Sequence, residues 1–182
     1  RYPEADDLDE FWAALAEGRD CIREVPRERW DAAALFDPVR HRPGKSYSKW
    51  GGFLRDIASF DHGSFGVPRS DAEFLDPQER LWLETAYHAF EDAGYTPKSV
   101  HDQSVGIFVG VMSNMYDKLH TRIEGATLSP FASHASIANR TSYQFDLHGP
   151  SLALDTMCSS SLTAIHLACE SLWRGESAMA LA

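Results

Sequence analysis

An α/β fold is predicted because strand-like and helix-like segments alternate along the chain. Two apolar segments, Val105–Val111 and Ser151–Met157, are expected to be buried strands. Helical spacing of apolar residues follows each of them, over Ala132–Phe145 and from Cys158 to Trp173. Strands and helices in alternation indicate a layered sheet covered by helices.

The region before the first strand begins with a helix and continues as an irregular segment. Acidic residues Asp6–Glu10 precede an apolar stretch that Gly18 ends, which is typical of an amphipathic helix. Residues 19–55 hold nine of the 17 basic residues against five acids and are interrupted by prolines, so loops and short turns are expected. This segment is either a solvated surface loop or a docking surface for an acidic partner. Gly51–Leu54 is expected as a short strand or turn.

A long helix is predicted between Asp76 and Gly94. Pro77 lies in its first turn, apolar residues recur at helical spacing, and the glycine ends it. Asp76 and Glu79 are interpreted as favourable charges at the helix N-terminus rather than as an acid/base pair.

Composition excludes several classes of protein. The 182 residues carry a formal charge of −10, so nucleic acid is not expected as a partner. No apolar run reaches the length of a membrane span, and no signal peptide is expected. Three cysteines without a C-x-x-C pair indicate a reduced, cytoplasmic protein.

Both ends of the sequence are interpreted as truncated. Arg1 opens the chain without a methionine, and Ser177–Ala182 resembles a strand that stops before any turn. We therefore expect residues 1–182 to be a fragment of a longer protein.

Cys158 is the candidate catalytic residue because a strand delivers it to the start of a helix. Unsatisfied backbone N–H groups and the helix dipole at that place favour a thiolate and can hold an oxyanion. Small residues Ser159–Ser161 are expected to leave room for a substrate, and Leu162 and Ile165 to anchor the helix in the core. Cys169, about three turns further along, is expected in the core, and Cys21 is interpreted as an inert thiol.

No histidine of the sequence is identified as a partner for this cysteine. His166 lies about 12 Å along the same helix and on a different face, and His148 lies at the far end of the entering strand. The remaining histidines are expected to be surface or satisfied core residues. They are His41, His62, His88, His101, His120 and His134.

Several motifs in register resemble β-ketoacyl synthase (ketosynthase) domains of modular polyketide synthases. Asp155–Leu162 is similar to the family's D-T-A-C-S-S-S-L active-site motif, and Leu75–Leu81 to its M-D-P-Q-Q-R-L helix start. Ser48–Trp50 and Asp92–Tyr95 are most similar to assembly lines whose acyltransferase is a separate, trans-acting protein. Further matching segments are Pro26 with Arg29–Asp31, Gly51–Leu54, Leu83–Thr85, Glu91–Gly94, Ile137–Arg140, Phe145–Leu147 and Gly149–Ser151.

The resemblance implies a thiolase-like αβαβα fold of which residues 1–182 form roughly the first half. It implies a homodimer that needs no metal or redox cofactor and works with the other domains of a multidomain synthase. Cys158 would accept an acyl chain from the phosphopantetheine arm of an acyl carrier protein, and its backbone N–H would contribute to the oxyanion hole. A malonyl-type thioester would then lose CO2 and attack the acyl-cysteine. The family's two catalytic histidines and its lysine belong to motifs beyond Ala182.

Alternatives remain open at this point. The domain could transfer acyl chains without elongating them, or it could be a non-catalytic scaffold, although such scaffolds usually lack the cysteine. Met157 stands where many family members have alanine. It is either tolerated variation in the core or a residue that shapes the floor of the acyl pocket.

Overall fold

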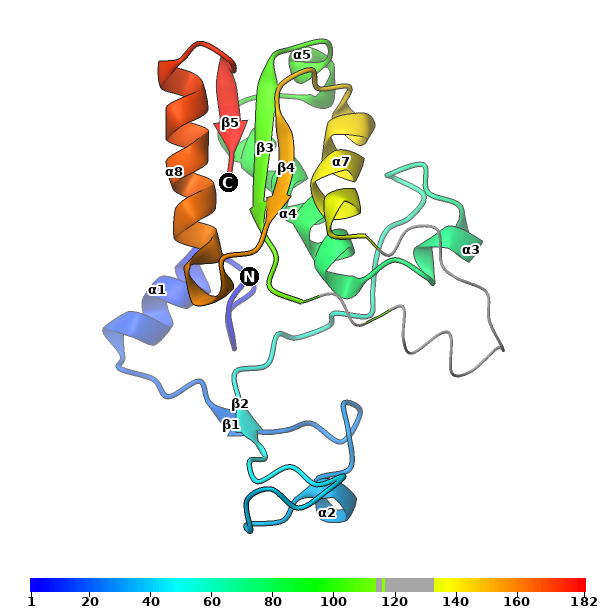
Figure 1. Ribbon diagram of the computed structural model, residues 1–182, viewed down its shortest axis with the longest axis vertical. Helices are drawn as coiled ribbons and strands as arrows, with labels where there is room; N and C mark the ends of the chain where they lie inside the picture. The colour runs from blue at the N-terminus through cyan, green and yellow to red at the C-terminus, as the bar shows by residue number, and fades with distance from the viewer. Residues whose placement is uncertain (114–115, 117–132) are drawn as a thin grey trace. The chain divides into compact units, whose positions relative to one another are not determined.

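The computed structural model describes residues 1–113, 116 and 133–182. The chain forms two compact units, Arg1–Ile57 and Ala58–Ala182. The first unit is mostly irregular, and the second contains a parallel sheet covered by helices (Figure 1). None of the helices in the described part of the chain combines the length and the apolarity that crossing a membrane requires.

The first unit confirms both the predicted helix and the irregular segment. Helix α1 spans Leu8–Ala16, and the Asp7 side chain caps it by accepting a hydrogen bond from the Glu10 amide. Gly18 follows in the left-handed conformation, as a helix stop requires. The remaining elements are short and confirm a loop-rich segment. They are β1 (Arg23–Glu24), α2 (Ala32–Leu35) and β2 (Trp50–Gly51), with β1 and β2 antiparallel.

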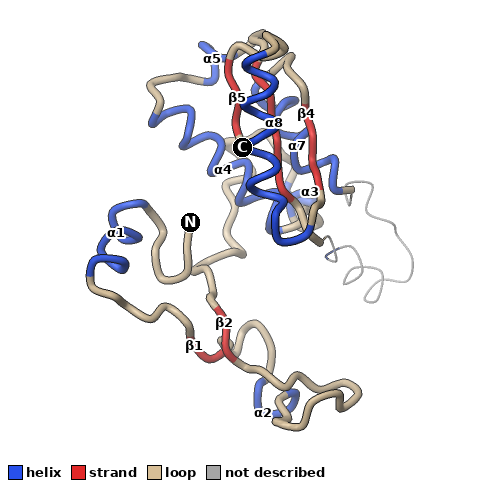
Figure 2. Tube along the Cα trace, turned by 60° about the vertical axis from the view of Figure 1, so that its left-hand side comes forward, coloured by secondary structure: helices blue, strands red, loops and turns tan. Residues whose placement is uncertain are grey.

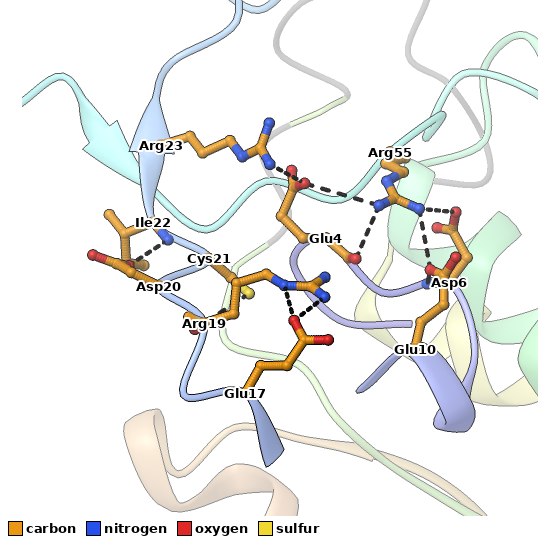
Figure 3. A network of polar contacts seen from close by, with 10 residues as sticks. All are labelled: Glu4, Asp6, Glu10, Glu17, Arg19, Asp20, Cys21, Ile22, Arg23 and Arg55. Carbon is orange, nitrogen blue, oxygen red and sulfur yellow. Dashed lines mark hydrogen bonds and ion pairs between the residues drawn. The ribbon is translucent and has the colours of Figure 1, made fainter. Parts of the chain in front are cut away.

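Several basic side chains of the first unit form ion pairs with acids of the same unit. The Arg55 guanidinium contacts the Asp6 and Glu10 carboxylates at 3.3 and 3.1 Å and donates to the Glu4 carbonyl at 3.0 Å (Figure 3). The hydrogen bond to Asp6 and the charge of Glu10 raise the pKa of Arg55 above its usual value. Arg23 pairs with Glu4 in the same network. This internal pairing favours the surface-loop interpretation of residues 19–55 over an acidic docking partner.

The second unit is built on a three-stranded parallel sheet. Strand β3 (Val105–Gly110) lies between β4 (Ser151–Leu154) and β5 (Met179–Leu181). Helix α8 (Ser160–Trp173) covers one face, and α4 (Pro77–Asp92) and α7 (His134–Phe145) cover the other (Figure 2). The described part of this unit also contains the short helices α3 (Arg69–Ala72) and α5 (Pro97–Val100).

Strand β3 confirms the prediction of a buried strand. Ile107 and Val109 pack in the cluster that includes residues of α4 and α7, whereas Phe108 packs against Ala164 and Ala168 of α8. Because successive side chains of a strand point to opposite faces, both faces must be covered to bury all of them.

The prediction for the second strand was wrong in length and burial. The expected strand over Ser151–Met157 stops at Leu154, and Leu152 is exposed. The physical reason is position: β4 pairs with β3 on one side only, so it is the edge strand of the described sheet.

The two predicted helices that cover the sheet are confirmed. Asp76 caps α4 through the Gln78 amide, and Gly94 follows the helix in the left-handed conformation. Helix α7 begins at His134, whereas the first residue predicted for it, Ala132, lies outside the described residues. The buried face of α7 includes Ile137, Ala138, Thr141 and Phe145.

Glu79 lies in the first turn of α4, as the sequence-based interpretation placed it, and has a further role. Its side chain is 1% exposed and forms an ion pair with Arg140 of α7. Ser136 also donates a hydrogen bond to the Glu79 carboxylate at 2.8 Å. A buried carboxylate needs such partners, so this pair fastens α4 to α7 in addition to placing a negative charge in the first turn of the helix.

Replacing Arg140 by alanine should destabilise the protein by about 3–5 kcal/mol, because the buried Glu79 carboxylate would lose its cation. Denaturant unfolding measures the loss. Arg174→Ala is the matched control, since Arg174 pairs with Glu170 four residues earlier on a solvent-facing part of α8. That change should cost less than about 1 kcal/mol. Equal losses in the two variants would contradict the role given to the Glu79 pair.

Gly149 lies where β4 enters the sheet and approaches the backbone of β3. A Cβ atom at this position would lie 2.4 Å from the carbonyl atoms of Val105. We expect Gly149→Ala to destabilise the protein by about 1–3 kcal/mol because neither backbone can give way. Gly63→Ala, whose Cβ would meet nothing closer than 3.6 Å, should leave the midpoint of thermal unfolding nearly unchanged. A Gly149 variant as stable as the Gly63 variant would refute the close approach.

Candidate active site

Cys158 lies in the turn that joins β4 to α8. After Leu154 the chain passes through Asp155 and Thr156 into a 3-10 turn, Met157–Ser159, and α8 begins at Ser160. The strand therefore delivers the cysteine to the start of a helix, as predicted, but the cysteine precedes the first α-helical residue. The reason is local: Met157 has a left-handed φ of 58°, which ends the extended chain and reverses its course.

The three cysteines differ in exposure. Cys158 is exposed, whereas Cys21 and Cys169 are half-buried, and all three are free thiols. The expectation that Cys169 is a core residue was too strong, because its side of α8 is only partly covered. Of the three, Cys158 has the most open access for a substrate.

Hydrogen bonds to and from the side chains of Asp155 and Ser160 define the turn before the cysteine. The Met157 amide donates to the Asp155 carboxylate at 2.8 Å. The Ser160 hydroxyl donates to the Met157 carbonyl at 2.8 Å and accepts from the Thr156 amide at 2.9 Å. We call Asp155–Ser160 the elbow.

A second group of hydroxyls lies on the exposed side of the elbow. The Ser159 hydroxyl donates to the Thr156 carbonyl at 2.8 Å and contacts the Thr156 hydroxyl at 3.0 Å. The Thr163 hydroxyl donates to the Ser159 carbonyl at 3.0 Å. These contacts link the start of α8 to the end of the strand that precedes it.

The three serines after Cys158 have different surroundings. Ser159 and Ser161 are exposed and can leave space for a substrate, as expected. Ser160 is 5% exposed and is part of the hydrogen-bonded turn, so the expectation was wrong for this residue. The sequence alone does not distinguish the buried serine from its two neighbours, because all three residues are serine.

The start of α8 lies against the carboxyl end of β3 at Gly110. A Cβ atom at Gly110 would come within 2.8 Å of the backbone of Ser160 and Ser161. A residue with a side chain would therefore push the helix away from the strand. From the sequence, Gly110 was interpreted only as part of an apolar strand. A glycine at a strand end is the sequence feature that indicates such a close approach.

The orientation predicted for α8 was wrong. Leu162 and Ile165 were expected to anchor the helix in the core, but they are 73% and 49% exposed. The buried face consists of small residues, Ser160, Ala164, Ala168 and Ser171. Small side chains let the helix lie close to β3, so the large apolar residues face away from this sheet.

Several histidines of the described chain contact groups other than Cys158. His148 lies 3.4 Å from Asp102 and 3.6 Å from Asp146, before the start of β4, and His101 contacts Asp146 at 3.1 Å. Strand β4 separates this cluster from the elbow. No histidine in the described ranges hydrogen-bonds to Cys158; His120 lies outside these ranges. Within the same ranges, no group of three His, Cys, Asp or Glu side chains is arranged to hold a metal ion.

Comparisons with known proteins cover the whole chain. The profile of the β-ketoacyl synthase N-terminal domain matches residues 1–182. Polyketide synthase ThaG of Burkholderia thailandensis is 56% identical over 185 residues, and polyketide synthase PksL of Bacillus subtilis is 50% identical over 191 residues. Each match covers 100% of this chain but only 3% and 4% of the respective relative.

Solved ketosynthase structures share the fold. An oxazolomycin ketosynthase domain (OzmH) of Streptomyces albus is 50% identical with a TM-score of 0.89, over 97% of this chain and 31% of that chain. A ketosynthase from module 6 of the bacillaene synthase of Bacillus subtilis, in a cysteine-to-serine form, is 39% identical with a TM-score of 0.89. That match covers 99% of this chain and 30% of the other.

These likenesses confirm the thiolase-like fold expected from the motifs, with the chain spanning its N-terminal part. The similarity to ThaG, PksL and the bacillaene ketosynthase agrees with the expected trans-acyltransferase type. The chain belongs to the β-ketoacyl synthase family, and its residues correspond to the N-terminal part of a polyketide synthase ketosynthase domain.

Proposed function

We propose that this chain carries the acyl-accepting cysteine of a polyketide chain-extending ketosynthase. The observation that supports the proposal is the exposed Cys158 thiol, which a strand-to-helix elbow presents in a chain of this family. A cysteine that follows a sharp turn and precedes a helix is accessible to a carbonyl carbon and adjacent to backbone N–H donors.

The proposed first step is a transfer of an acyl group between two thiols. The Cys158 thiolate attacks the carbonyl carbon of an acyl thioester on the phosphopantetheine arm of an acyl carrier protein. The tetrahedral oxyanion is stabilised by N–H groups at the elbow, including that of Cys158. The carbon–sulfur bond to phosphopantetheine then breaks, the carrier thiol leaves, and the acyl group remains on Cys158.

In the proposed second step, a malonyl-type thioester on a carrier protein loses CO2. The resulting carbanion attacks the acyl-Cys158 carbonyl, forms the new carbon–carbon bond and releases the cysteine thiolate. No described residue is assigned to the decarboxylation, because the resemblance places the two histidines and the lysine in motifs beyond Ala182. A transfer-only ketosynthase would carry out the first step and release no CO2.

The surroundings of the reaction follow from the same resemblance. We propose that the domain binds no metal or redox cofactor, that its substrates arrive on acyl carrier proteins, and that it works beside other domains of a multidomain synthase. Nucleic acid and membrane are not proposed as partners. The free thiols support a reducing cytoplasmic location.

Incubation with an acyl thioester should add one acyl mass to a ketosynthase domain that carries residues 1–182. We expect Cys158→Ala to abolish the added mass, because the nucleophilic sulfur is lost, and Cys169→Ala to retain it. Intact-protein mass spectrometry measures both. The control is matched because Cys169 is a free thiol on α8, the helix that Cys158 immediately precedes. Acylation that persists in the Cys158 variant would overturn the proposal.

We further propose that the homodimer implied by the resemblance forms along the outer edge of β4. This edge has no strand partner among the described residues, and exposed Leu152 and Tyr143 lie on β4 and on the adjoining helix α7. An edge strand beside exposed apolar side chains is suited to pairing with a second copy.

Tyr143→Lys should raise the dissociation constant of this dimer about 10- to 100-fold, because a charge would be buried where an aromatic side chain packed. Concentration-dependent light scattering of a ketosynthase domain that carries the chain measures the dissociation. Tyr95→Lys, at another exposed tyrosine, should leave the dimer intact. If Tyr143→Lys and the wild type dissociate alike, the β4 edge is not the interface.

A further inference from the structure

Met157 has a backbone conformation that residues with a side chain rarely adopt. Its φ is 58°, in the left-handed region, where the Cβ atom crowds the neighbouring carbonyl oxygen. Its side chain is 64% exposed, so packing of the side chain does not hold it in place. The surrounding hydrogen bonds must therefore supply the constraint.

Hydrogen bonds to side chains fix three consecutive peptide groups of the elbow. Ser160 Oγ accepts from the Thr156 N–H at 2.9 Å, and Asp155 Oδ1 accepts from the Met157 N–H at 2.8 Å. Ser160 Oγ also donates to the Met157 carbonyl at 2.8 Å, to which the Ser160 backbone N–H donates as well. The peptide planes on both sides of the Met157 Cα are thereby held, which fixes its φ and ψ.

The orientation of the third peptide bears directly on Cys158. The Met157 carbonyl and the Cys158 N–H belong to one planar trans peptide, so they point in opposite directions. A serine hydroxyl that holds the carbonyl on the buried side therefore aims the Cys158 N–H toward the open side. This N–H is the group that the proposed function assigns to the oxyanion.

Ser160 itself is held in place by the end of β3. Its side chain is buried, and its Cβ lies 2.9 Å from the place that a Cβ of Gly110 would occupy. The close fit against a glycine leaves the hydroxyl little freedom to turn away. Ser161, the next residue, is exposed.

We propose that Asp155 and Ser160 are positioning residues for acyl transfer. They hold Met157 in its left-handed conformation and so orient the Cys158 amide and thiol toward the incoming thioester. The inference rests on the proposed function of Cys158 and adds two residues that act through the Met157 peptide groups.

The test compares Ser160→Ala with Ser171→Ala, which removes another buried serine hydroxyl from the same face of α8 at the far end of the helix, in a ketosynthase domain that carries residues 1–182. A butanoyl thioester of N-acetylcysteamine is the acyl donor, and the rate of mass gain on Cys158 is measured over a range of donor concentrations. We expect Ser160→Ala to lower the saturating rate about 10-fold or more. The half-saturating concentration should change less than about twofold, because the donor-binding surface is untouched. Ser171→Ala should retain the wild-type rate within about twofold, because the Ser171 hydroxyl contacts Ser177 and not the elbow.

A second substitution separates positioning from general packing. Glycine adopts positive φ without hydrogen bonds that hold the neighbouring peptide groups. The double variant Met157→Gly with Ser160→Ala should therefore have a saturating rate within about fivefold of that of Met157→Gly alone. Losses that simply multiply in the double variant would overturn the inference.

Substitutions of Asp155, which is exposed, provide an independent test of the inference. Asp155→Asn keeps an oxygen acceptor for the Met157 amide and should retain the rate, whereas Asp155→Ala should lower it about 10-fold. Equal rates in these two variants would also overturn the inference. If the wild-type domain gains no acyl mass on Cys158, the proposed function itself fails, which distinguishes the two outcomes.

Discussion

The close approach of α8 to β3 is the constraint on which the site depends. Gly110 has no side chain, and the buried face of α8 consists of serines and alanines, so the helix start lies against the strand end. This contact buries Ser160 and brings its hydroxyl to the backbone of Thr156 and Met157. The geometry around Cys158 is thus determined by small residues on two elements that are distant in the sequence.

The same arrangement explains why large apolar side chains of α8 are exposed. Leu162 and Trp173 lie on the helix face that points away from β3. The chain spans about 30% of the solved ketosynthase chains that it matches.

Charged groups serve the architecture in both units. Glu79 and Arg140 join α4 to α7 inside the second unit, and Arg55 joins the start of the chain to the end of the first unit through Glu4, Asp6 and Glu10. The two cases differ in environment, because the Glu79 carboxylate is excluded from water whereas the Arg55 network is exposed to it. Removal of one partner is therefore far more costly in the first case.

Local chemistry in the sequence determined the elements and the identity of the candidate nucleophile. Apolar segments, helical spacing of apolar residues, a proline in the first turn of α4 and stop glycines locate helices and strands because these effects act over a few residues. Several motifs in register, the one around Cys158 among them, indicated the family. Only the tertiary structure decided which face of α8 is buried, that β4 is an edge strand, and that Ser160 rather than Ser159 or Ser161 supports the elbow. These features depend on contacts between distant segments, which periodicity and composition do not encode.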